Sequence, residues 1–226
     1  MPTIQCLDDC LATFKATLGA DVKSLLAHYT AENAKPGPKA SWLQASLRAS
    51  CVLLAASLET FVEGSVCAAF THLADRHVVA DKYPKTFRYW LFRTELHMRK
   101  IGVEDAKKHV ELTQRLFSPV RPLTLQELQL DVLKKEFANP IPSDVSWMAS
   151  LFDEVEYVDS LTLTVLGKPT KAKAAIGELA KRRNDIAHGD TNQKPKDTDV
   201  ERLSKFCQLF GNQFTKDLTK WTSCCL

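Results

Sequence analysis

Residues 42–76 constrain the fold most strongly, because apolar side chains recur through them at steps of three and four residues, the period of a single α-helix. The recurring positions are Leu43, Leu47, Leu54, Leu58, Phe61, Val62, Val66, Ala69, Phe70 and Leu73. The middle of the segment, Ala49–Leu58, is apolar or small on every side. A helix has this pattern when neighbouring elements cover all of its faces. We therefore predict one long helix at the centre of a helical core.

The two ends of the chain show the same helical period. Residues 3–30 predict a first helix with a possible bend near Gly19, and residues 199–221 predict a last helix with an apolar face. Asp197 or Thr198 is the expected N-cap of that last helix. The fold class we expect is all-α.

The middle of the chain is less regular, and its prolines divide it into short pieces. Residues 84–137 predict two to four shorter helices. We interpret residues 78–145 as a helical elaboration within a single domain that spans residues 1–226. The predicted architecture is a helical bundle with a long central helix and a helical insertion.

Residues 139–188 carry the remaining local signals. Asn139-Pro140 predicts a turn, and Ser143 or Asp144 is the expected cap of a helix over 145–157. Apolar residues alternate in Ser160–Leu166, which predicts either a short strand or a loop. Residues 170–188 are helical again.

Composition excludes several classes of protein. Hydrophobic residues make up 45% and charged residues 25% of the 226 residues, which excludes a disordered chain. The apolar run at Ala49–Leu58 is far shorter than the roughly 20 residues of a membrane span, so we expect no membrane segment. The formal net charge is +3, but residues 168–221 alone carry +5. The basic excess therefore lies in the C-terminal quarter.

The cysteines and glycines predict no metal site and no cofactor. The seven cysteines are irregularly spaced and include no C-x-x-C pair, which argues against zinc and favours free thiols in the cytoplasm. Gly167-Lys168-Pro169-Thr170 lacks the upstream glycine of a phosphate-binding P-loop.

The most informative string is Lys181-Arg182-Arg183-Asn184-Asp185-Ile186-Ala187-His188-Gly189-Asp190, at the end of a predicted helix. Gly189 suits the left-handed position that follows a helix. Arg183 and His188 are five residues apart, about 140° around an ideal helix, so they do not share one face. Both can meet one substrate if the helix ends between them or if a second protomer completes the site.

An arginine with a histidine is sufficient equipment for cleaving RNA without a metal. The imidazole moves protons near neutral pH, and the guanidinium holds a phosphate with paired donors. RNA supplies its own nucleophile, the 2′-hydroxyl. The spacing alone is a weak signal, since roughly 0.8 chance matches are expected in a chain of this composition. By itself it also fits a basic helix end with a surface histidine.

The wider string, Arg-Arg-Asn-x-Ile-Ala-His-Gly, closely resembles the motif of the HEPN superfamily of helical ribonucleases and nucleotide-associated domains. The helix over residues 47–61, the Asn139-Pro140 segment and the helix at Leu151-Phe152 follow in the order of the subgroup called RiboL-PSP-HEPN. The resemblance spans roughly residues 41–221, the HEPN-like core.

The resemblance implies a homodimer in which two motifs form one RNA-cleaving cleft, as in toxins or antiviral-defence effectors, with an antitoxin or defence-system protein as a further partner. It assigns catalysis to Arg183, Asn184 and His188. Arg182 also satisfies the motif spacing, so it is an alternative catalytic arginine. Otherwise Arg182 and Lys181 attract RNA.

Two observations bear on this interpretation. Toxins of this superfamily that a nucleotidyltransferase silences carry a Tyr two residues after the His, whereas this chain has Asp190, which argues against such silencing. Some HEPN domains are inactive and serve as dimeric nucleotide- or partner-binding modules, which is the alternative function. Retention of Arg183, Asn184 and His188 favours the active interpretation.

Glu59 follows the apolar run of the central helix directly. It could point inward and hold Arg183 or Arg182 by a charge-assisted hydrogen bond. Most glutamates in this setting are solvated, which is the alternative for Glu59.

Overall fold

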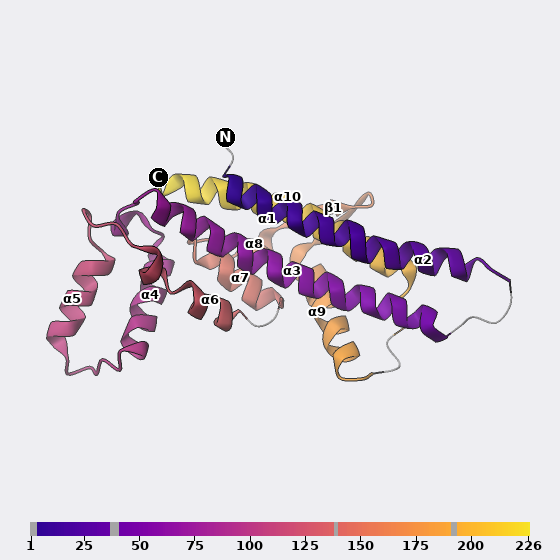
Figure 1. Ribbon diagram of the computed structural model, residues 1–226, viewed down its shortest axis with the longest axis horizontal. Helices are drawn as coiled ribbons and strands as arrows, with labels where there is room; N and C mark the ends of the chain where they lie inside the picture. Colours follow the sequence, from indigo (N-terminus) through magenta and orange to yellow (C-terminus); the bar gives the residue numbers. More distant parts are fainter. Residues whose placement is uncertain (1–3, 37–40, 138–139, 191–193) are drawn as a thin grey trace.

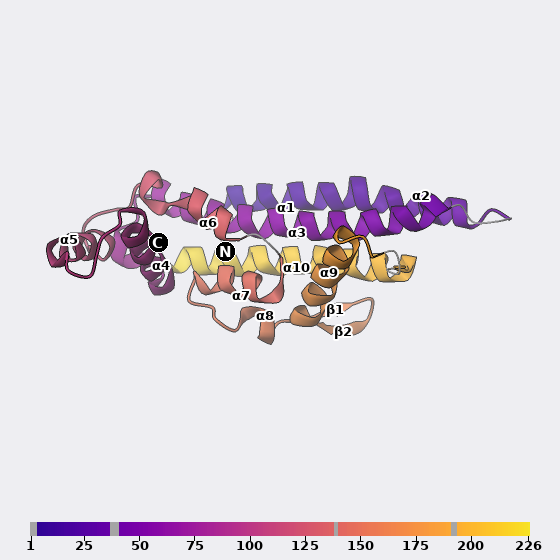
Figure 2. The same cartoon turned by 90° about the horizontal axis from the view of Figure 1, so that it is seen from below.

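Helices α1 (Gln5–Thr17) and α2 (Lys23–Asn33) follow each other end to end, and together they lie beside α3 (Ser41–Asp75) and α10 (Asp197–Cys224) in an elongated bundle to which the other elements attach (Figures 1 and 2). The computed structural model describes residues 4–36, 41–137, 140–190 and 194–226. The other elements are η2 (Ala80–Lys82), α4 (Lys85–Met98), α5 (Ala106–Leu116), η3 (Leu125–Leu128), α6 (Leu130–Glu136), α7 (Pro142–Ser150), α8 (Tyr157–Ser160), β1 (Thr162–Val165), β2 (Lys168–Lys171) and α9 (Ala172–Ala187). The predicted helical fold is confirmed.

The first helix is interrupted where the sequence predicts a bend. A π-helical turn, η1 (Leu18–Val22), joins α1 to α2 and contains Gly19. A π-turn adds one residue to a helical turn and so shifts the register of the next helix. Leu18 and Val22 nevertheless both remain fully buried. The turn therefore keeps the apolar side of both helices on the bundle.

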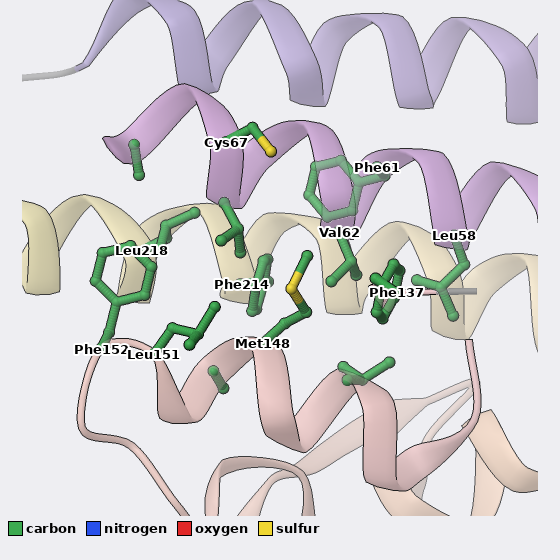
Figure 3. Packing of buried hydrophobic residues seen from close by; sticks show 14 of the residues in the cluster. Leu58, Phe61, Val62, Cys67, Phe137, Met148, Leu151, Phe152, Phe214 and Leu218 are labelled. Atoms are coloured by element: carbon green, nitrogen blue, oxygen red, sulfur yellow. The ribbon is translucent and has the colours of Figure 1, made fainter. Parts of the chain in front are cut away.

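The helix α3 is the core of the bundle, as predicted. It packs against α1, α2, α7, α9 and α10. In Figure 3, Val62 on α3 lies near Phe214 on α10, and Met148 on α7 points toward both helices. The Phe61 ring lies 4.5 Å from Phe14 and 6.1 Å from Phe214, centroid to centroid. Apolar burial by several neighbours is what the run at Ala49–Leu58 requires.

By length and composition alone, α3 is also long and apolar enough to cross a membrane. The sequence-based expectation considered only the shorter apolar run at Ala49–Leu58. An 18-residue window within Trp42–Asp75 has a mean hydropathy of 1.5. Half of that window is buried inside the protein, as in the core helix of a helical bundle.

Two predicted helix caps are wrong. The helix α7 begins at Pro142, so Ser143 and Asp144 lie inside its first turn, and it ends at Ser150 rather than 157. A proline is favoured at the first helical position because its missing N–H has no partner to lose there. The predicted turn residue Asn139 lies outside the described residues.

The helix α10 begins at Asp197, and Lys196 occupies the N-cap position. Asp197 and Thr198 are therefore inside the helix. The Lys196 backbone N–H donates to Asp199 Oδ2 at 3.3 Å, so the capping carboxylate belongs to Asp199, two residues after the expected Asp197.

Ser160–Leu166 does contain a strand. β1 pairs antiparallel with β2, a strand that we did not predict. Leu166 and Gly167 form the two-residue connection, with φ of 49° and 79°. Two successive positive φ values are typical of the type I′ hairpin turn, whose twist matches that of the paired strands. Gly167-Lys168 is thus part of a hairpin.

Part of residues 78–145, the segment that we interpret as a helical elaboration, projects from one end of the bundle. α4 and α5 form an arm, residues 85–116, seen at the left of Figure 1. Asp153 fastens its base. This residue has φ 66°, and its carboxylate accepts from the Lys85 and Thr86 backbone N–H groups at 3.1 and 2.9 Å. The loop after α7 therefore caps the N-terminus of α4.

The close approach of α10 to α1 depends on Gly211. A methyl group at Gly211 would lie 2.9 Å from Phe14 Cε1, and that ring is buried and stacked on Phe61. We expect Gly211→Ala to lower the free energy of unfolding by about 1–3 kcal/mol, the usual cost of overpacking a core. Chemical denaturation measures it.

Gly177→Ala on α9 is the matched control. Its nearest neighbour would be Pro142 Cγ at 3.5 Å, an ordinary contact. Alanine is the better helix former by up to about 1 kcal/mol, so this variant should be as stable as the parent or more so. Equal stabilities of the two variants would contradict the close-contact argument.

Candidate functional site

The motif helix α9 ends where the sequence predicts. The Gly189 backbone, at φ 80°, turns the chain out of the helix. The Gly189 N–H donates to Ile186 O at 3.1 Å, and the Asp190 N–H donates to Asp185 O at 3.0 Å. These two bonds form a Schellman motif, which satisfies the last carbonyl groups of the helix. His188 is therefore the C-cap residue of α9.

The two halves of α9 lie in different environments. Its buried residues, Ala172, Ala175, Ile176, Leu179 and Ala180, all precede position 181. None of the residues 181–190 is buried. Figure 1 shows the C-terminal end of α9 projecting below α3, away from the bundle. The first half anchors the helix, and the second half presents the motif.

Arg182 is engaged within the protein. Its Nε donates to Glu178 Oε1 at 3.1 Å, and its Nη2 donates to Asp199 Oδ2 at 3.1 Å. Arg202 on α10 donates to both oxygens of Glu178, at 2.6 and 2.7 Å. The Arg182 side chain is only 20% exposed. This four-residue network joins α9 to α10.

Arg183 points elsewhere, because consecutive residues are about 100° apart around a helix. Its Nη1 donates to Asn184 Oδ1 at 3.0 Å, and both residues are half-buried. Lys181 is exposed and lies 2.6 Å from Asp185. Arg183 and Asn184 thus form a connected pair, while Arg182 serves the fold.

His188 is exposed at the tip of α9. Its backbone N–H donates to Asn184 O at 2.9 Å, so the helical geometry continues to this residue. The separation of about 140° between Arg183 and His188 therefore holds in this structure. One protomer brings Arg183 to Asn184, and His188 faces solvent.

Glu59 on α3 is half-buried and near Arg183. Burial raises the pKa of the Glu59 carboxyl above its ordinary value, and the Arg183 charge lowers it by a smaller amount. Glu63 adds to the increase. The arginine is thus close enough to influence Glu59, but the net effect of the surroundings disfavours the ionised carboxyl.

Among the described residues, no group of three or more His, Cys, Asp and Glu side chains is placed to hold a metal ion.

The family model for RiboL-PSP-HEPN matches residues 18–220 of this chain. The chain belongs to the RiboL-PSP-HEPN family. The match begins within η1, so it includes α2 as well as the helices from α3 onward. Neither the curated proteins nor the solved structures gave a match. The matched residues include the whole motif helix α9. Membership in this HEPN family points to a ribonuclease or a nucleotide-binding module.

Sequence reasoning missed the network of Glu178, Asp199 and Arg202 around Arg182, in which Glu178 and Asp199 contact Arg182 directly and Arg202 contacts Glu178. The Glu178–Arg182 pair is visible as an i, i+4 charge pair on one helix, so this contact could have been found. Asp199 and Arg202 lie on α10, beyond a loop, and no local pattern connects them to Arg182.

The raised pKa of Glu59 predicts a specific pH dependence. A folded-state pKa above the unfolded value means that stability falls as the pH rises from about 4.3 through the folded pKa. Glu59→Gln removes this loss. We expect its unfolding free energy to increase relative to the parent over that range and then to level off.

Chemical denaturation at several pH values from about 4 to 8 measures the difference in unfolding free energy between Glu59→Gln and the parent. This range starts near the pKa of a free glutamate, roughly 4.3. A variant that loses stability relative to the parent as pH rises would contradict the burial argument. It would support instead the sequence-based expectation that Glu59 holds Arg183 or Arg182 by a charge-assisted hydrogen bond.

Proposed function

We propose that this protein is a metal-independent endoribonuclease that cleaves single-stranded RNA in a composite site at a homodimer interface. The observation that supports this best is the placement of Arg183, Asn184 and His188. They lie at an uncovered helix end that projects from the bundle, in a chain of the RiboL-PSP-HEPN family. A toxin or an antiviral-defence effector in the cytoplasm, held in check by an antitoxin or defence-system protein, fits such an activity.

The residue roles follow from their contacts. His188 acts as a general acid or base, because an exposed imidazole can reach a substrate and exchange protons near neutral pH. Arg183 stabilises the charge that gathers on the scissile phosphate. Asn184 orients the guanidinium through the 3.0 Å bond. Lys181 attracts RNA, whereas Arg182 positions α9 through Asp199, which favours Arg183 as the catalytic arginine.

The chemistry uses the substrate's own nucleophile. The 2′-hydroxyl loses its proton, its oxygen bonds to the adjacent phosphorus, and the bond from phosphorus to the 5′-oxygen of the next nucleotide breaks. The leaving oxygen takes up a proton. The products are a 2′,3′-cyclic phosphate and a 5′-hydroxyl. In-line approach of the 2′-oxygen needs a flexible backbone, so we expect single strands to be preferred over the A-form duplex.

Cleavage by the full chain is tested with an RNA oligonucleotide and its 2′-deoxy counterpart, both in EDTA. We expect only the RNA to be cut. His188→Ala should lower the rate by about two to four decades, and Arg183→Ala by about two to three. Separation of the products by mass identifies the cyclic phosphate.

Arg182→Ala is the matched control, because it removes the neighbouring arginine. We expect it to cost roughly 1–3 kcal/mol of unfolding free energy through its lost charged hydrogen bonds. Arg183→Ala should leave the melting temperature nearly unchanged. Cleavage of the deoxy strand, loss of all activity in EDTA, or full activity in His188→Ala would each contradict this mechanism. The last result would favour a dimeric nucleotide- or partner-binding module.

A second protomer is expected because Arg183 and His188 diverge by about 140° on one helix. Two α9 ends facing each other across a two-fold axis bring Arg183 of one copy near His188 of the other. Sedimentation at micromolar concentration should show a dimer. A strict monomer that cleaves RNA would rule out the composite site.

A further inference from the structure

The helix α4 carries an exposed row of cationic and aromatic side chains that plays no part in the α9 site. Lys85, Tyr89, Arg93 and His97 follow one another at four-residue steps, and all four are exposed. Four-residue steps turn by about 40°, so the row occupies a sector of about 120°. It runs about 18 Å along the helix. We name it the α4 row.

The helix α4 itself contributes no exposed carboxylate to this row. The only acidic residue of α4 is Glu95, which is 4% exposed and faces away from it. Glu95 accepts from Arg99 Nε at 2.6 Å, from Arg115 Nη2 at 2.8 Å and from Gln129 Nε2 at 3.0 Å. The carboxylate of α4 is thus paired internally, and the side chains that α4 places in the row are cationic or neutral.

Two carboxylates lie beside the row. Asp153, exposed in the loop after α7, accepts from the Lys85 and Thr86 backbone N–H groups at the start of α4. Glu136 on α6 is 3.9 Å from Arg93, and Trp90 Nε1 donates to its Oε2 at 2.9 Å. The Arg93 side chain is 74% exposed, so this pair is long and solvated. Such surface pairs contribute little. A phosphate can replace Glu136 at Arg93 while Trp90 continues to hold Glu136.

Tyr89 gives the row an aromatic platform. Tyr89 is 64% exposed, and its ring makes a T-shaped contact with the Phe117 ring at 5.6 Å, centroid to centroid. The Arg88 guanidinium packs on the same Phe117 ring at 4.9 Å. Tyr89 is therefore a supported ring with an accessible surface. Aromatic rings between cations are how proteins hold single-stranded nucleic acid, since bases stack on the ring and cations bind phosphates.

The arm lies on the same side of the bundle as the motif. Figure 1 shows α4 and the end of α9 both projecting below α3, with α6 between them. We propose that the α4 row binds single-stranded RNA outside the cleavage site, with Tyr89 stacking on a base and Lys85 and Arg93 contacting phosphates. The proposal rests on the proposed function, since it assigns an additional contact to the same substrate.

Binding is measured with the full chain carrying His188→Ala, so that RNA stays intact, on a fluorescent single-stranded RNA over a range of salt concentrations. Adding Tyr89→Ala should weaken binding about 5- to 150-fold, whereas Tyr89→Phe keeps the ring and should bind like the parent. Adding Lys85→Gln and Arg93→Gln together should reduce the slope of log affinity against log salt by about 1.4.

The matched control is Lys15→Gln with Lys23→Gln, which changes the charge equally on the exposed surface of α1 and α2, on the opposite side of the bundle. It should leave the affinity and the slope near the parent values. Circular dichroism melting confirms that each variant is folded.

Three results would overturn the proposal. If the parent binds RNA and the α4 variants bind it equally well, the α4 row has no role in RNA binding. Cleavage of RNA by the wild type would in that case still support the proposed function. If the α4 variants lose affinity for a polyglutamate peptide but not for RNA, the row serves an acidic protein. If the parent binds no RNA and the wild type cleaves none, both proposals fail.

Discussion

The apolar surface of α3 has to be removed from water on nearly every side, and the remaining elements are arranged around that requirement. The helices α1 and α2 pack along it, α10 lies alongside, and α7 and α9 pack against it as well. Because these neighbours are separated widely in the sequence, burying one helix brings distant parts of the chain together. The position of the motif helix is a consequence of this packing, since the first half of α9 is buried as part of the same core.

The two adjacent arginines of the motif have different surroundings, because one connects α9 to α10 and the other lies on a different side of the helix. Arg182 turns toward Glu178 and Asp199, where its charge is compensated and joins two helices. Arg183 turns by about 100° to Asn184 and the vicinity of Glu59. One side chain thus rigidifies the helix that presents the other. In the proposed site, this anchoring keeps the Arg183 guanidinium in place for a phosphate.

Much of the fold could be predicted because helical periodicity is local. The helix over 42–76, the interruption near Gly19 and the end of α9 at Gly189 all follow from residues close together in the chain. The predicted caps at Ser143 and Asp197 failed because a proline and a more distant carboxylate occupy those roles. The strand β2 was missed because four residues that include a proline carry no periodic signal, and only pairing with β1 defines them.

By itself the sequence determined the helical class, the long central helix, and the Arg-Asn-His string with its terminating glycine, since each depends on the geometry of a single helix. The tertiary structure decided which of these residues are paired within the protein and which are exposed. Arg182 donates to Asp199, His188 is exposed, and the Asp153 carboxylate caps the N-terminus of α4 at the base of the α4–α5 arm. The physical reason is that burial and charge pairing depend on neighbours in space, and those neighbours are chosen by the packing of α3 rather than by any local pattern.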